Sequence, residues 1–391
     1  MIKLRKFHIT QFPEDRIFIL LEKRFHKRIF DYINTNYKFR DLNITLFNNK
    51  LNKHTYKTWR YRIKKPNAKL PRFIPLWFIN KIPTISKNKH KLERIENKII
   101  AYKGPSSSSI IWKPKLPLKE NSKLLKILAH VLGDGHIGGA FGTKLSKGKS
   151  NSQYRNFNND LLNSFERDLQ VFGRVKTSKN YEHGHVLFPN LIGYIIEYVY
   201  KIKTNTFVSR LPKDLYLLNK KVLSSFLRAF FDDEGHVYDN HTELYSCNKN
   251  LILDIKKLII KRFRNLKISK LRVNKSSKNP KYYFYILSES RETFLREIGF
   301  DSPEKRKDMI FNIKRVKLPK YGRKTKLNII RLLKNKDMCA KEISRKLYIS
   351  HDSILFHLNN LFKKNKVNII SKGKHNENIW KLNNDLKLHA S

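Results

Sequence analysis

Two acidic residues stand at matching places in this chain, and carboxylates of this kind hold divalent metal ions in many proteins. Asp134 ends the run Lys123-Leu-Leu-Lys-Ile-Leu-Ala-His-Val-Leu-Gly-Asp, and Glu234 ends a similar run that begins at Val222. In both runs the apolar residues form a stretch of helical length, and in both the acid is followed by Gly and His. The two acids lie 100 residues apart, and a repeat of this length predicts two copies of one structural unit.

Elementary electrostatics disfavours a carboxylate at each of these positions unless a cation is bound there. The C-terminal end of a helix carries partial negative charge, and burial of an unpaired carboxylate adds a further cost. A divalent cation reverses the sign of both contributions. If the helices pack side by side through the small residues Ala129 and Ala229, both carboxylates emerge at the same end. We therefore predict a site for Mg²⁺ or Mn²⁺, with Gly135 and Gly235 ending the helices in a left-handed conformation.

The segments that follow the two acids also agree with each other, which extends the predicted repeat. Each acid is followed by strand-forming residues, a polar turn, an amphipathic helix, further strand residues and a last helix. The repeating unit is therefore predicted to be helix, two strands, helix, two strands, helix. After the first acid the expected helices reach Leu169 and span 191–200, and after the second they reach Phe263 and span 292–298.

The two runs resemble the two signature helices of the LAGLIDADG homing endonucleases, and the resemblance covers residues 120–313. It implies an α+β core with pseudo-twofold symmetry, in which each αββαββα half adds an antiparallel sheet to a saddle over the DNA major groove. Asp134 and Glu234 match the acids that bind divalent metal in that family and position the attacking water for hydrolysis of both DNA strands. Because both motifs occur in one chain, a monomer is expected.

The chain departs from the usual signature at several positions. Leu132 stands where the first motif often has an additional Asp, whereas Asp232 keeps that acid in the second motif. Glu234 replaces the more usual Asp, as in several archaeal members of the family, so a ligand is retained. Gly133 and Asp233, which directly precede the two acids, are the additional candidate metal contacts.

Basic residues and histidines near the two motifs are further candidates. The family commonly places a basic residue near the end of each half, where it stabilises charge that develops in the reaction; a solvated surface lysine is the competing interpretation. The imidazoles that follow the glycines could reach DNA, while His130, one helical turn before the first acid, is expected to pack at an interface. The candidates are Lys203 in the first half and Lys305 or Lys307 in the second for the reaction, and His136 and His236 for DNA contact.

The charge of the whole chain points to a polyanionic partner. Among 391 residues, Lys and Arg total 83 and Asp and Glu total 32, which leaves a formal net charge of +51. Such a charge repels itself in a compact fold, and Lys and Arg contacts to phosphate are favoured by counterion release, so double-stranded DNA is the expected partner. A genomic bias toward Lys, Asn and Ile explains part of the excess, but it does not remove acidic residues.

The sequence also argues against several other classes of protein. No apolar run approaches the ~20 residues of a membrane-spanning helix, and the segment that starts at Met1 does not have the pattern of a signal peptide. Cys247 and Cys339 cannot form a disulfide framework or a zinc knuckle, which fits a reducing cytoplasm. The chain begins with neither Cys nor Ser and ends Leu388-His-Ala-Ser, so a protein-splicing element is not expected.

Two breaks in composition divide the chain into three regions. Lys103-Gly-Pro-Ser-Ser-Ser-Ser, followed by Lys113-Pro-Lys-Leu-Pro, is typical of a linker, and a second break lies near Pro319-Lys-Tyr-Gly. The expected organisation is a helical domain at 1–103, a linker at 104–119, a core at 120–318 with halves of about 120–212 and 213–318, and a last domain at 324–391.

The first region contains two short predicted helices with a tight connection, which is the skeleton of a helix-turn-helix. Residues 41–47 form the first helix, and the second begins at His54. The second would be the recognition helix, although a solvated helical pair explains the same pattern. The candidate DNA contacts are Tyr56, Lys57, Arg60 and Arg62.

The last region has the pattern of a winged helix. Apolar spacing predicts three helices, beginning near residues 326, 340 and 351, and a two-stranded wing that starts at Val367 and resumes at Asn378 after a Gly-Lys-His turn. The third helix would present His351, Ser353 and His357 to DNA, although some winged helices serve protein contacts instead.

These patterns together favour a monomeric, metal-dependent endonuclease that cuts both strands of a specific DNA sequence. Two other classes stay open. A transcription regulator that keeps the scaffold without cutting agrees with the winged helix, and an intron RNA maturase agrees with the family, some members of which assist splicing. Intact acids at both helix ends favour the enzyme over the regulator.

Overall fold

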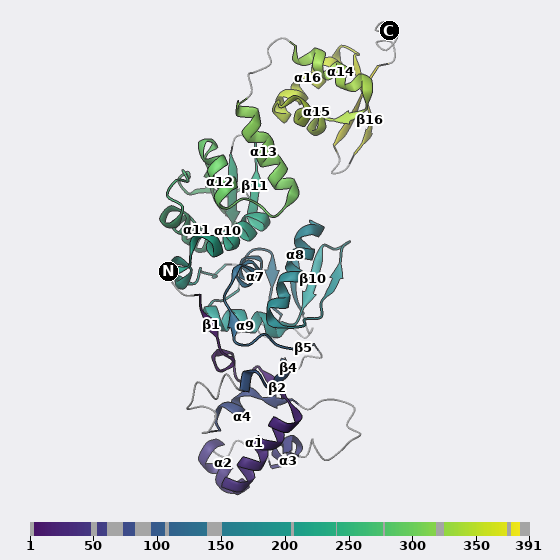
Figure 1. Cartoon of the computed structure of the whole chain (residues 1–391). Helices are drawn as coiled ribbons and strands as arrows, with labels where there is room; N and C mark the ends of the chain where they lie inside the picture. The colour runs from purple at the N-terminus through teal and green to yellow at the C-terminus, as the bar shows by residue number, and fades with distance from the viewer. Residues whose placement is uncertain are drawn as a thin grey trace.

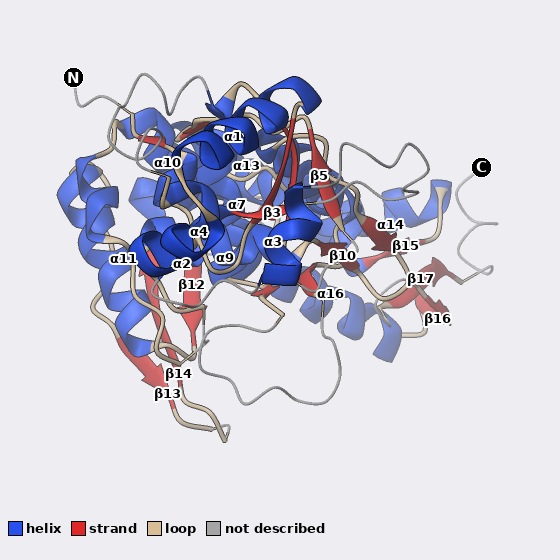
Figure 2. Ribbon diagram, turned by 90° about the horizontal axis from the view of Figure 1, so that it is seen from below, coloured by secondary structure: helices blue, strands red, loops and turns tan. Residues whose placement is uncertain are grey.

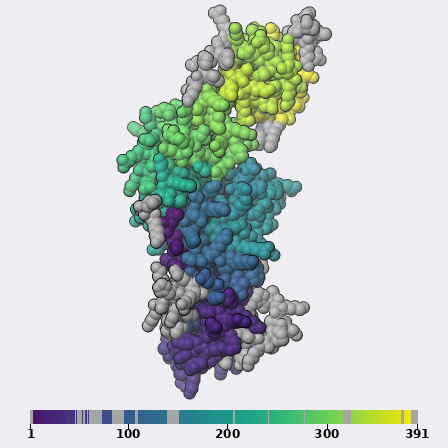
Figure 3. Space-filling view, in the orientation of Figure 1, coloured from purple at the N-terminus to yellow at the C-terminus, as the bar shows by residue number. Residues whose placement is uncertain are grey.

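The structure is a computed structural model in which the regions follow one another along the length of the molecule (Figures 1 and 3). The helices of the N-terminal region lie at one end, those of the C-terminal region lie at the other, and the two acid-bearing segments lie between them. None of the described helices is long and apolar enough to cross a membrane. The structure describes residues 4–47, 53–60, 73–82, 95–105, 109–138, 151–204, 207–239, 241–276, 278–317, 324–373 and 377–383.

The N-terminal region combines helices with a sheet, which corrects the prediction of a helical domain. Its elements are β1 (Lys6–Phe7), β2 (Phe18–Leu21), α1 (Lys23–Asn36), α2 (Phe39–Phe47), α3 (Lys53–Arg60), β3 (Ile74–Pro75), α4 (Leu76–Asn80), β4 (Ile99–Lys103) and β5 (Ile110–Trp112). Four of the strands form an antiparallel sheet in the order β3-β2-β4-β5. The predicted pair of helices is present as α2 and α3, and stacked rings of Phe30, Phe47 and Phe78 join α1, α2 and α4.

The segment predicted as a linker is built into the fold. Apolar strands β4 and β5 flank the Gly-Pro-Ser run, so that run connects two paired strands. A further strand, β6 (Leu118–Lys119), pairs with β1, and beside it the buried Glu120 accepts a hydrogen bond from Nη2 of Arg5 at 2.6 Å. Buried apolar side chains from Phe7 to Met309 form one continuous cluster. The N-terminal region therefore shares its core with the middle of the chain.

Two apolar helices lie side by side in the middle of the molecule. They are α7 (Ser122–Leu132) and α10 (Lys220–Glu234), which pack against each other along their length. Each begins at an asparagine cap, Asn121 or Asn219, whose side-chain oxygen accepts an N–H bond from the first turn at 3.0 Å. Most of their side chains are buried, as the apolar runs predict.

The same order of elements follows each of these helices. After α7 come β7 (Gly135–His136), β8 (Ser152–Arg155), α8 (Asn159–Leu169), β9 (Ser178–Asn180), β10 (His185–Phe188) and α9 (Asn190–Tyr200); after α10 come β11 (Gly235–Val237), β12 (Thr242–Ser246), α11 (Lys249–Arg262), β13 (Arg272–Asn274), β14 (Lys281–Ile286) and α12 (Arg291–Glu297). The two antiparallel sheets have matching strand orders, β7-β8-β10-β9 and β11-β12-β14-β13. Helix α8 packs on the first sheet (Figure 1), and α11 packs on the second (Figure 2).

The C-terminal region is a three-helix unit with a small sheet and a buried apolar cluster of its own. It follows α13 (Pro303–Lys317) and contains α14 (Thr325–Asn335), β15 (Met338–Cys339), α15 (Ala340–Leu347), α16 (His351–Lys363), β16 (Val367–Lys372) and β17 (Asn378–Leu382). The three helices and the two wing strands lie where the sequence predicts them, and β15 completes a sheet of order β15-β17-β16. Arg345 pairs with Asp308 of α13, and the ring of Tyr348 stacks on Phe311 at 5.5 Å between centroids.

Candidate metal centre and nucleic-acid interface

The two acids lie at the ends of the paired helices. Asp134 follows Gly133, the cap residue of α7, and Glu234 is the last residue of α10. The helix ends approach each other so closely that a Cβ atom on Gly133 would lie 3.0 Å from Oδ2 of Asp233. The predicted packing residues Ala129 and Ala229 are both fully buried.

The glycines after the acids serve a different purpose from the one that the sequence suggested. Gly235 has an extended backbone, with φ −92° and ψ 148°, and Gly135 is also outside the left-handed region. A Cβ atom on Gly135 would lie 2.5 Å from Cα of Val131, and one on Gly235 would lie 2.3 Å from the carbonyl oxygen of Phe231. Glycine is therefore required because each strand starts directly against the last turn of its helix.

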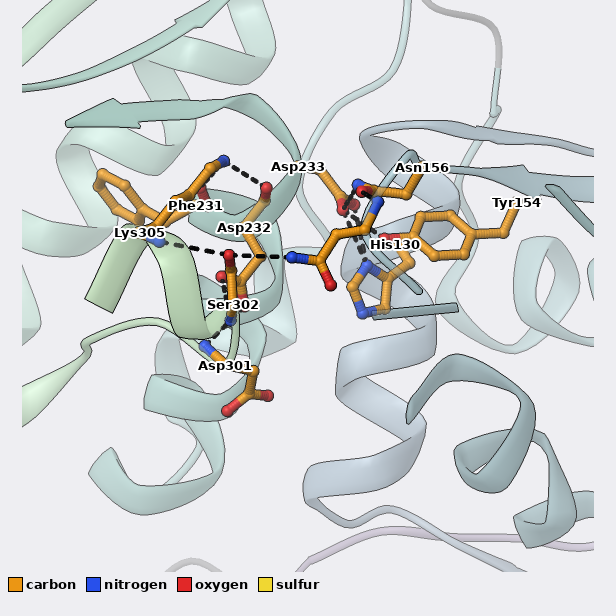
Figure 4. Close-up of polar contacts among 10 residues, drawn as sticks. His130, Tyr154, Asn156, Phe231, Asp232, Asp233, Asp301, Ser302 and Lys305 are labelled. Carbon is orange, nitrogen blue, oxygen red and sulfur yellow. Dashed lines mark hydrogen bonds and ion pairs between the residues drawn. The ribbon is translucent and has the colours of Figure 1, made fainter. Parts of the chain in front are cut away.

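A buried hydrogen-bond network joins the two helix ends (Figure 4). The side chain of Asp233 has no exposed surface, and its carboxylate accepts a bond from Oη of Tyr154 at 2.7 Å. Nδ1 of His130 lies 2.9 Å from the same carboxylate, and Nδ2 of Asn156 lies 3.5 Å from it. Burial lowers the pKa of His130, but the charge and hydrogen bond of Asp233 outweigh burial and raise that pKa overall.

This network revises one prediction and agrees with another. The carboxylate of Asp233 is fully engaged inside the protein, so the side chain is not free to bind a metal, contrary to the prediction. The reason is that His130 and Tyr154 of the first unit both point at it. His130 packs at the interface between the helices, as predicted.

Two further polar groups, one on α10 and one on α13, link the end of α10 to the start of α13 (Figure 4). Asp232 is buried, and its carboxylate accepts backbone N–H bonds from Asp301 at 2.9 Å and Ser302 at 3.0 Å. Lys305, in the first turn of α13, donates its ammonium group to three backbone carbonyls at the end of α10, including that of Gly235 at 2.6 Å. A cation at this end of a helix is favoured by the helix dipole. Lys305 thus ties α13 to the acid-bearing turn.

The carboxyl groups of the two acids resist ionisation. Burial, followed by the charges of Asp134 and Asp233, raises the pKa of Glu234 to about 8. Burial and the charge of Asp233 also raise the pKa of Asp134, although that residue is exposed on one side. Lys305 opposes both shifts without cancelling them. Acids that repel one another in this way are stabilised by an added cation.

The donor set fits Mg²⁺ or Mn²⁺ shared between the protein and a phosphate. Mg²⁺ is commonly held by one or two carboxylates, with water and substrate phosphate oxygens as the other ligands. Asp134 and Glu234 supply that number of carboxylates. Within the described part of the chain, no three His, Cys, Asp or Glu side chains are grouped to hold a metal ion by themselves. A closed, purely protein-bound site is therefore not what this arrangement offers.

Among the three predicted lysines, the structure brings Lys305 to the acids. Lys203 lies exposed after α9, and Lys307 lies exposed on α13. The charge of Lys305 lowers the pKa of both acids. The candidate roles of Lys203 and Lys307 in the reaction stay predictions without a contact to support them.

Three residues near the acids were not identified from the sequence. Asn156 makes a side-chain hydrogen bond to Asp134, and the backbone N–H of Arg155 donates to the carbonyl oxygen of Asp134 at 3.3 Å. The ammonium of Lys281 lowers the pKa of Glu234 by its charge. All three come from β8, from the turn after it, or from β14, which the antiparallel sheets return to the helix ends. Strand pairing of this kind has no signal in residue spacing.

The histidines predicted to contact DNA lie on exposed strand positions. His136 in β7 and His236 in β11 are both exposed. The ring of His236 packs against that of Tyr238, with 4.3 Å between centroids. Their positions leave DNA contact as a prediction for both.

The first predicted DNA-binding helix contributes less surface than expected. Tyr56 is buried, and its hydroxyl donates to Oδ1 of Asn34 at 3.1 Å, so it is a core residue and not a DNA contact. Its ring is buried because it packs among the aromatic side chains of the N-terminal region. Lys57 is exposed on α3. The side chain of Arg60 and the whole of Arg62 lie outside the described residues.

The predicted recognition helix of the C-terminal region is α16. Ser350 caps it by accepting a bond from the backbone N–H of Ser353 at 3.3 Å. His351, Ser353 and His357 are half-buried, while Phe356 on the same helix is 64% exposed. This placement keeps DNA contact by α16 a prediction.

Comparison with known proteins gives separate findings for the C-terminal region and for longer parts of the chain. Residues 323–368 match the family described as "Bacterial regulatory protein, arsR family", which supports a helix-turn-helix unit there. Two curated proteins of Methanocaldococcus jannaschii are similar: replication factor C small subunit, 26% identical over 197 residues, and glutamine–fructose-6-phosphate aminotransferase, 24% identical over 231 residues. The matches cover 50% and 55% of this chain but only 10% and 21% of those proteins. This chain is therefore similar to a segment of each protein, and the similarity does not extend to the activity for which either protein is named.

Three solved structures are partly similar to this one. Mesophilic variants of the homing endonuclease I-DmoI give a TM-score of 0.32 at 16% identity, covering 46% of this chain and 95% of theirs. I-DmoI in complex with DNA and Mn gives 0.31 at 17% identity, covering 46% and 96%. Full-length DUF199/WhiA from Thermatoga maritima gives 0.31 at 13% identity, covering 62% and 90%. Similarity at these scores says nothing about the chemistry of this chain.

Proposed function

We propose that this protein is a metal-dependent DNA endonuclease in which Asp134 and Glu234 would hold the divalent metal that supports hydrolysis of the DNA backbone. The observation that carries the proposal is the pair of carboxylates at the ends of two adjacent buried helices. The chain around them has a net charge of +51, which suits a DNA backbone. Because one chain supplies both acids, the proposed active form is a monomer with two related halves.

The residues around the acids have distinct parts in this proposal. When bound, Mg²⁺ or Mn²⁺ would supply a polarised phosphate and a water of lowered pKa. Asp233, with His130 and Tyr154, holds the two helix ends together so that both carboxylates keep their positions. Lys305 fixes α13 against the same turn. The exposed faces of the two sheets provide the surface for the duplex.

Cleavage of a randomised duplex library in Mg²⁺, with sequencing of the ends, tests the proposal. The wild-type protein should release defined ends, and Asp134→Asn or Glu234→Gln should lower the rate by about 10³-fold or more because a metal ligand is lost. The affinity of both variants for duplex DNA, measured in Ca²⁺, should stay within about tenfold of the wild-type affinity, since affinity comes mostly from basic residues. Asp160→Asn, on the exposed start of α8, is the matched control. Near wild-type cutting by either active-site variant would show the assignment to be wrong.

A DNA-binding regulator that does not cut is the second candidate, and the match of residues 323–368 to a regulatory family favours it. This candidate predicts tight duplex binding with no metal-dependent ends, and equal behaviour of wild type and Asp134→Asn. An intron RNA partner predicts tighter binding to RNA than to duplex DNA at the same salt concentration. The same protein preparation therefore distinguishes all three functions.

A further inference from the structure

The two sheets have the same strand order but present different side chains on their exposed faces. Helices α8 and α11 cover one face of each sheet, and alternate residues of each strand point to the other face. The pairing register places matching residues side by side. In the first sheet the exposed rows are His136, Gln153, Leu187 and then Arg155, His185, Asn180; in the second they are His236, Glu243, Tyr285 and then Tyr245, Tyr283, Arg272.

The exposed face of the second sheet is rich in aromatic rings, and we call Tyr245, Tyr283 and Tyr285 the tyrosine face. The rings of Tyr283 and Tyr285 lie 5.5 Å apart between centroids. The guanidinium carbon of Arg272 lies 5.0 Å from the centroid of Tyr285, and the ammonium of Lys281 lies 5.1 Å from that of Tyr245. Cations held over rings in this way are restricted in position before any ligand arrives.

The exposed face of the first sheet has no tyrosine at the matching positions. Leu187 stands where the second sheet has Tyr285, and Arg155 stands where it has Tyr245. Gln153 and Arg155 are adjacent side chains with donors and acceptors suited to base edges, an amide for adenine and a guanidinium for guanine. The first face is therefore built for hydrogen bonding, and the second is built for ring contacts around two fixed cations.

We propose that the two sheets read the two halves of a DNA target by different means, an inference that rests on the proposed function. The first sheet reads base edges in the major groove through Gln153 and Arg155. The second reads chiefly one guanine, through Arg272 held over Tyr285, while the other rings contact thymine methyl groups and sugars. A planar guanidinium that is fixed in place pairs with both acceptors of guanine, whereas ring contacts discriminate less between bases.

Selection of randomised duplexes by binding in Ca²⁺ tests this division, because no cutting is needed. The wild-type profile should show several strongly preferred positions in one half-site and a single strongly preferred guanine in the other. Arg272→Ala should lower the preference for that guanine by about 10-fold to 100-fold and leave the first half-site unchanged. Tyr285→Leu, which copies the residue of the first sheet, should weaken the same preference to a smaller degree.

Two further variants separate this role from charge and from folding. Arg272→Lys keeps the charge but loses the paired donors, so affinity should stay within a few-fold while the guanine preference falls. Lys257→Ala removes one charge from α11, on the covered side of the sheet, and should leave every position unchanged. An unchanged profile for Arg272→Lys, or equal preferences in both half-sites, would overturn the inference while leaving the endonuclease proposal intact. Absence of any preferred duplex for the wild type would instead remove the proposed function itself.

Discussion

The two helix ends that carry the acids differ in the residues that precede each acid and in the contacts that those residues make. The end of α7 has Leu132 and Gly133 before its acid, whereas the end of α10 has Asp232 and Asp233 before Glu234. The carboxylates of both additional acids are taken up by internal hydrogen bonds. The three successive acids thus have different surroundings: Asp232 anchors the start of α13, Asp233 joins the two helices, and Glu234 is the proposed metal ligand.

The strand opposite each helix end differs in a matching way. Tyr154 of β8 pairs with Gly135, and Leu244 of β12 pairs with Gly235, so the two residues occupy corresponding positions. Only Tyr154 has a hydroxyl to offer, and it donates to Asp233. The cross-link between the halves is therefore one-sided: the second helix gives the carboxylate, and the first unit gives its donors. The two units thus keep acids at matching positions while the hydrogen bonds that support the helix ends are asymmetric.

The largest effect should come from breaking this cross-link. Asp233→Ala leaves His130 and Tyr154 buried without their partner, and we expect a loss of about 3 kcal/mol in the free energy of unfolding, measured by urea denaturation. Tyr154→Phe removes one neutral donor and should cost about 1 kcal/mol. Because the folded state raises the pKa of His130, the contribution is complete below the unfolded pKa and is lost as pH rises through the folded value. The cost of Asp233→Ala should accordingly be larger at pH 6 than at pH 9, and equal costs would contradict a charged pair.

A smaller loss is expected where the second helix end anchors α13. Asp232→Ala leaves the backbone N–H groups of Asp301 and Ser302 unpaired, which should lower the free energy of unfolding by about 2 kcal/mol. Asp232→Asn keeps one acceptor and should cost less than half as much. Hydrogen exchange at the start of α13 measures the effect locally. Unchanged protection of those two amides in Asp232→Ala would mean that α13 is held by Lys305 alone.

Replacing one of the two acids, Asp134 or Glu234, should increase the free energy of unfolding when metal is absent, whereas the replacements of Asp232 and Asp233 lower it. The pKa of Glu234 is raised to about 8 and that of Asp134 is also raised, so the folded state binds protons that the unfolded state has already released. Stability is therefore lost as pH rises above the unfolded values of about 4 and through the folded ones. In EDTA, Glu234→Gln should be more stable than wild type by at least about 1 kcal/mol at pH 8.5 and nearly equal to it at pH 4.5. Added Mg²⁺ should make wild type the more stable protein at pH 8.5. A stability difference between the two proteins that changes with neither pH nor Mg²⁺ would contradict the electrostatic explanation.

The sequence was informative wherever a local pattern decided the structure. Apolar runs and the acids that end them located α7 and α10, and three amphipathic helices with two strands located the C-terminal unit. Prediction from the sequence failed where contacts between segments far apart in the chain determine the position of a residue. Tyr56 is a residue type that often contacts DNA, but the aromatic rings around it bury it in the core. Asp233 has the position expected of a metal ligand, but His130 and Tyr154 occupy its carboxylate. The Gly-Pro-Ser run was taken for a linker because its pairing strands lie outside it.

The smallest effect on the metal centre should come from removing the C-terminal unit. The described residues of the C-terminal unit, 324–373 and 377–383, have a buried cluster of their own, and Arg345 and Tyr348 contact Asp308 and Phe311 of α13. Lys305, on the same helix, is held by carbonyls at the end of α10 and not by that unit. We therefore expect a protein truncated after Lys317 to cut at the same phosphates while its affinity falls by about 10-fold to 100-fold, because a tethered binding module is lost.

A variant that undocks the unit without deleting it sharpens this prediction. Phe311→Ala removes the ring on which Tyr348 stacks but keeps the tether, so its affinity should fall much less than that of the truncated protein. If the truncated protein binds duplex at high concentration and never cuts it, then α13 depends on the C-terminal unit for its position. In that case Phe311→Ala should also lose cutting, because the same helix carries Lys305 to the acids. If Phe311→Ala cuts normally while the truncation does not, the C-terminal unit must act on the DNA itself, by holding the duplex over the two carboxylates.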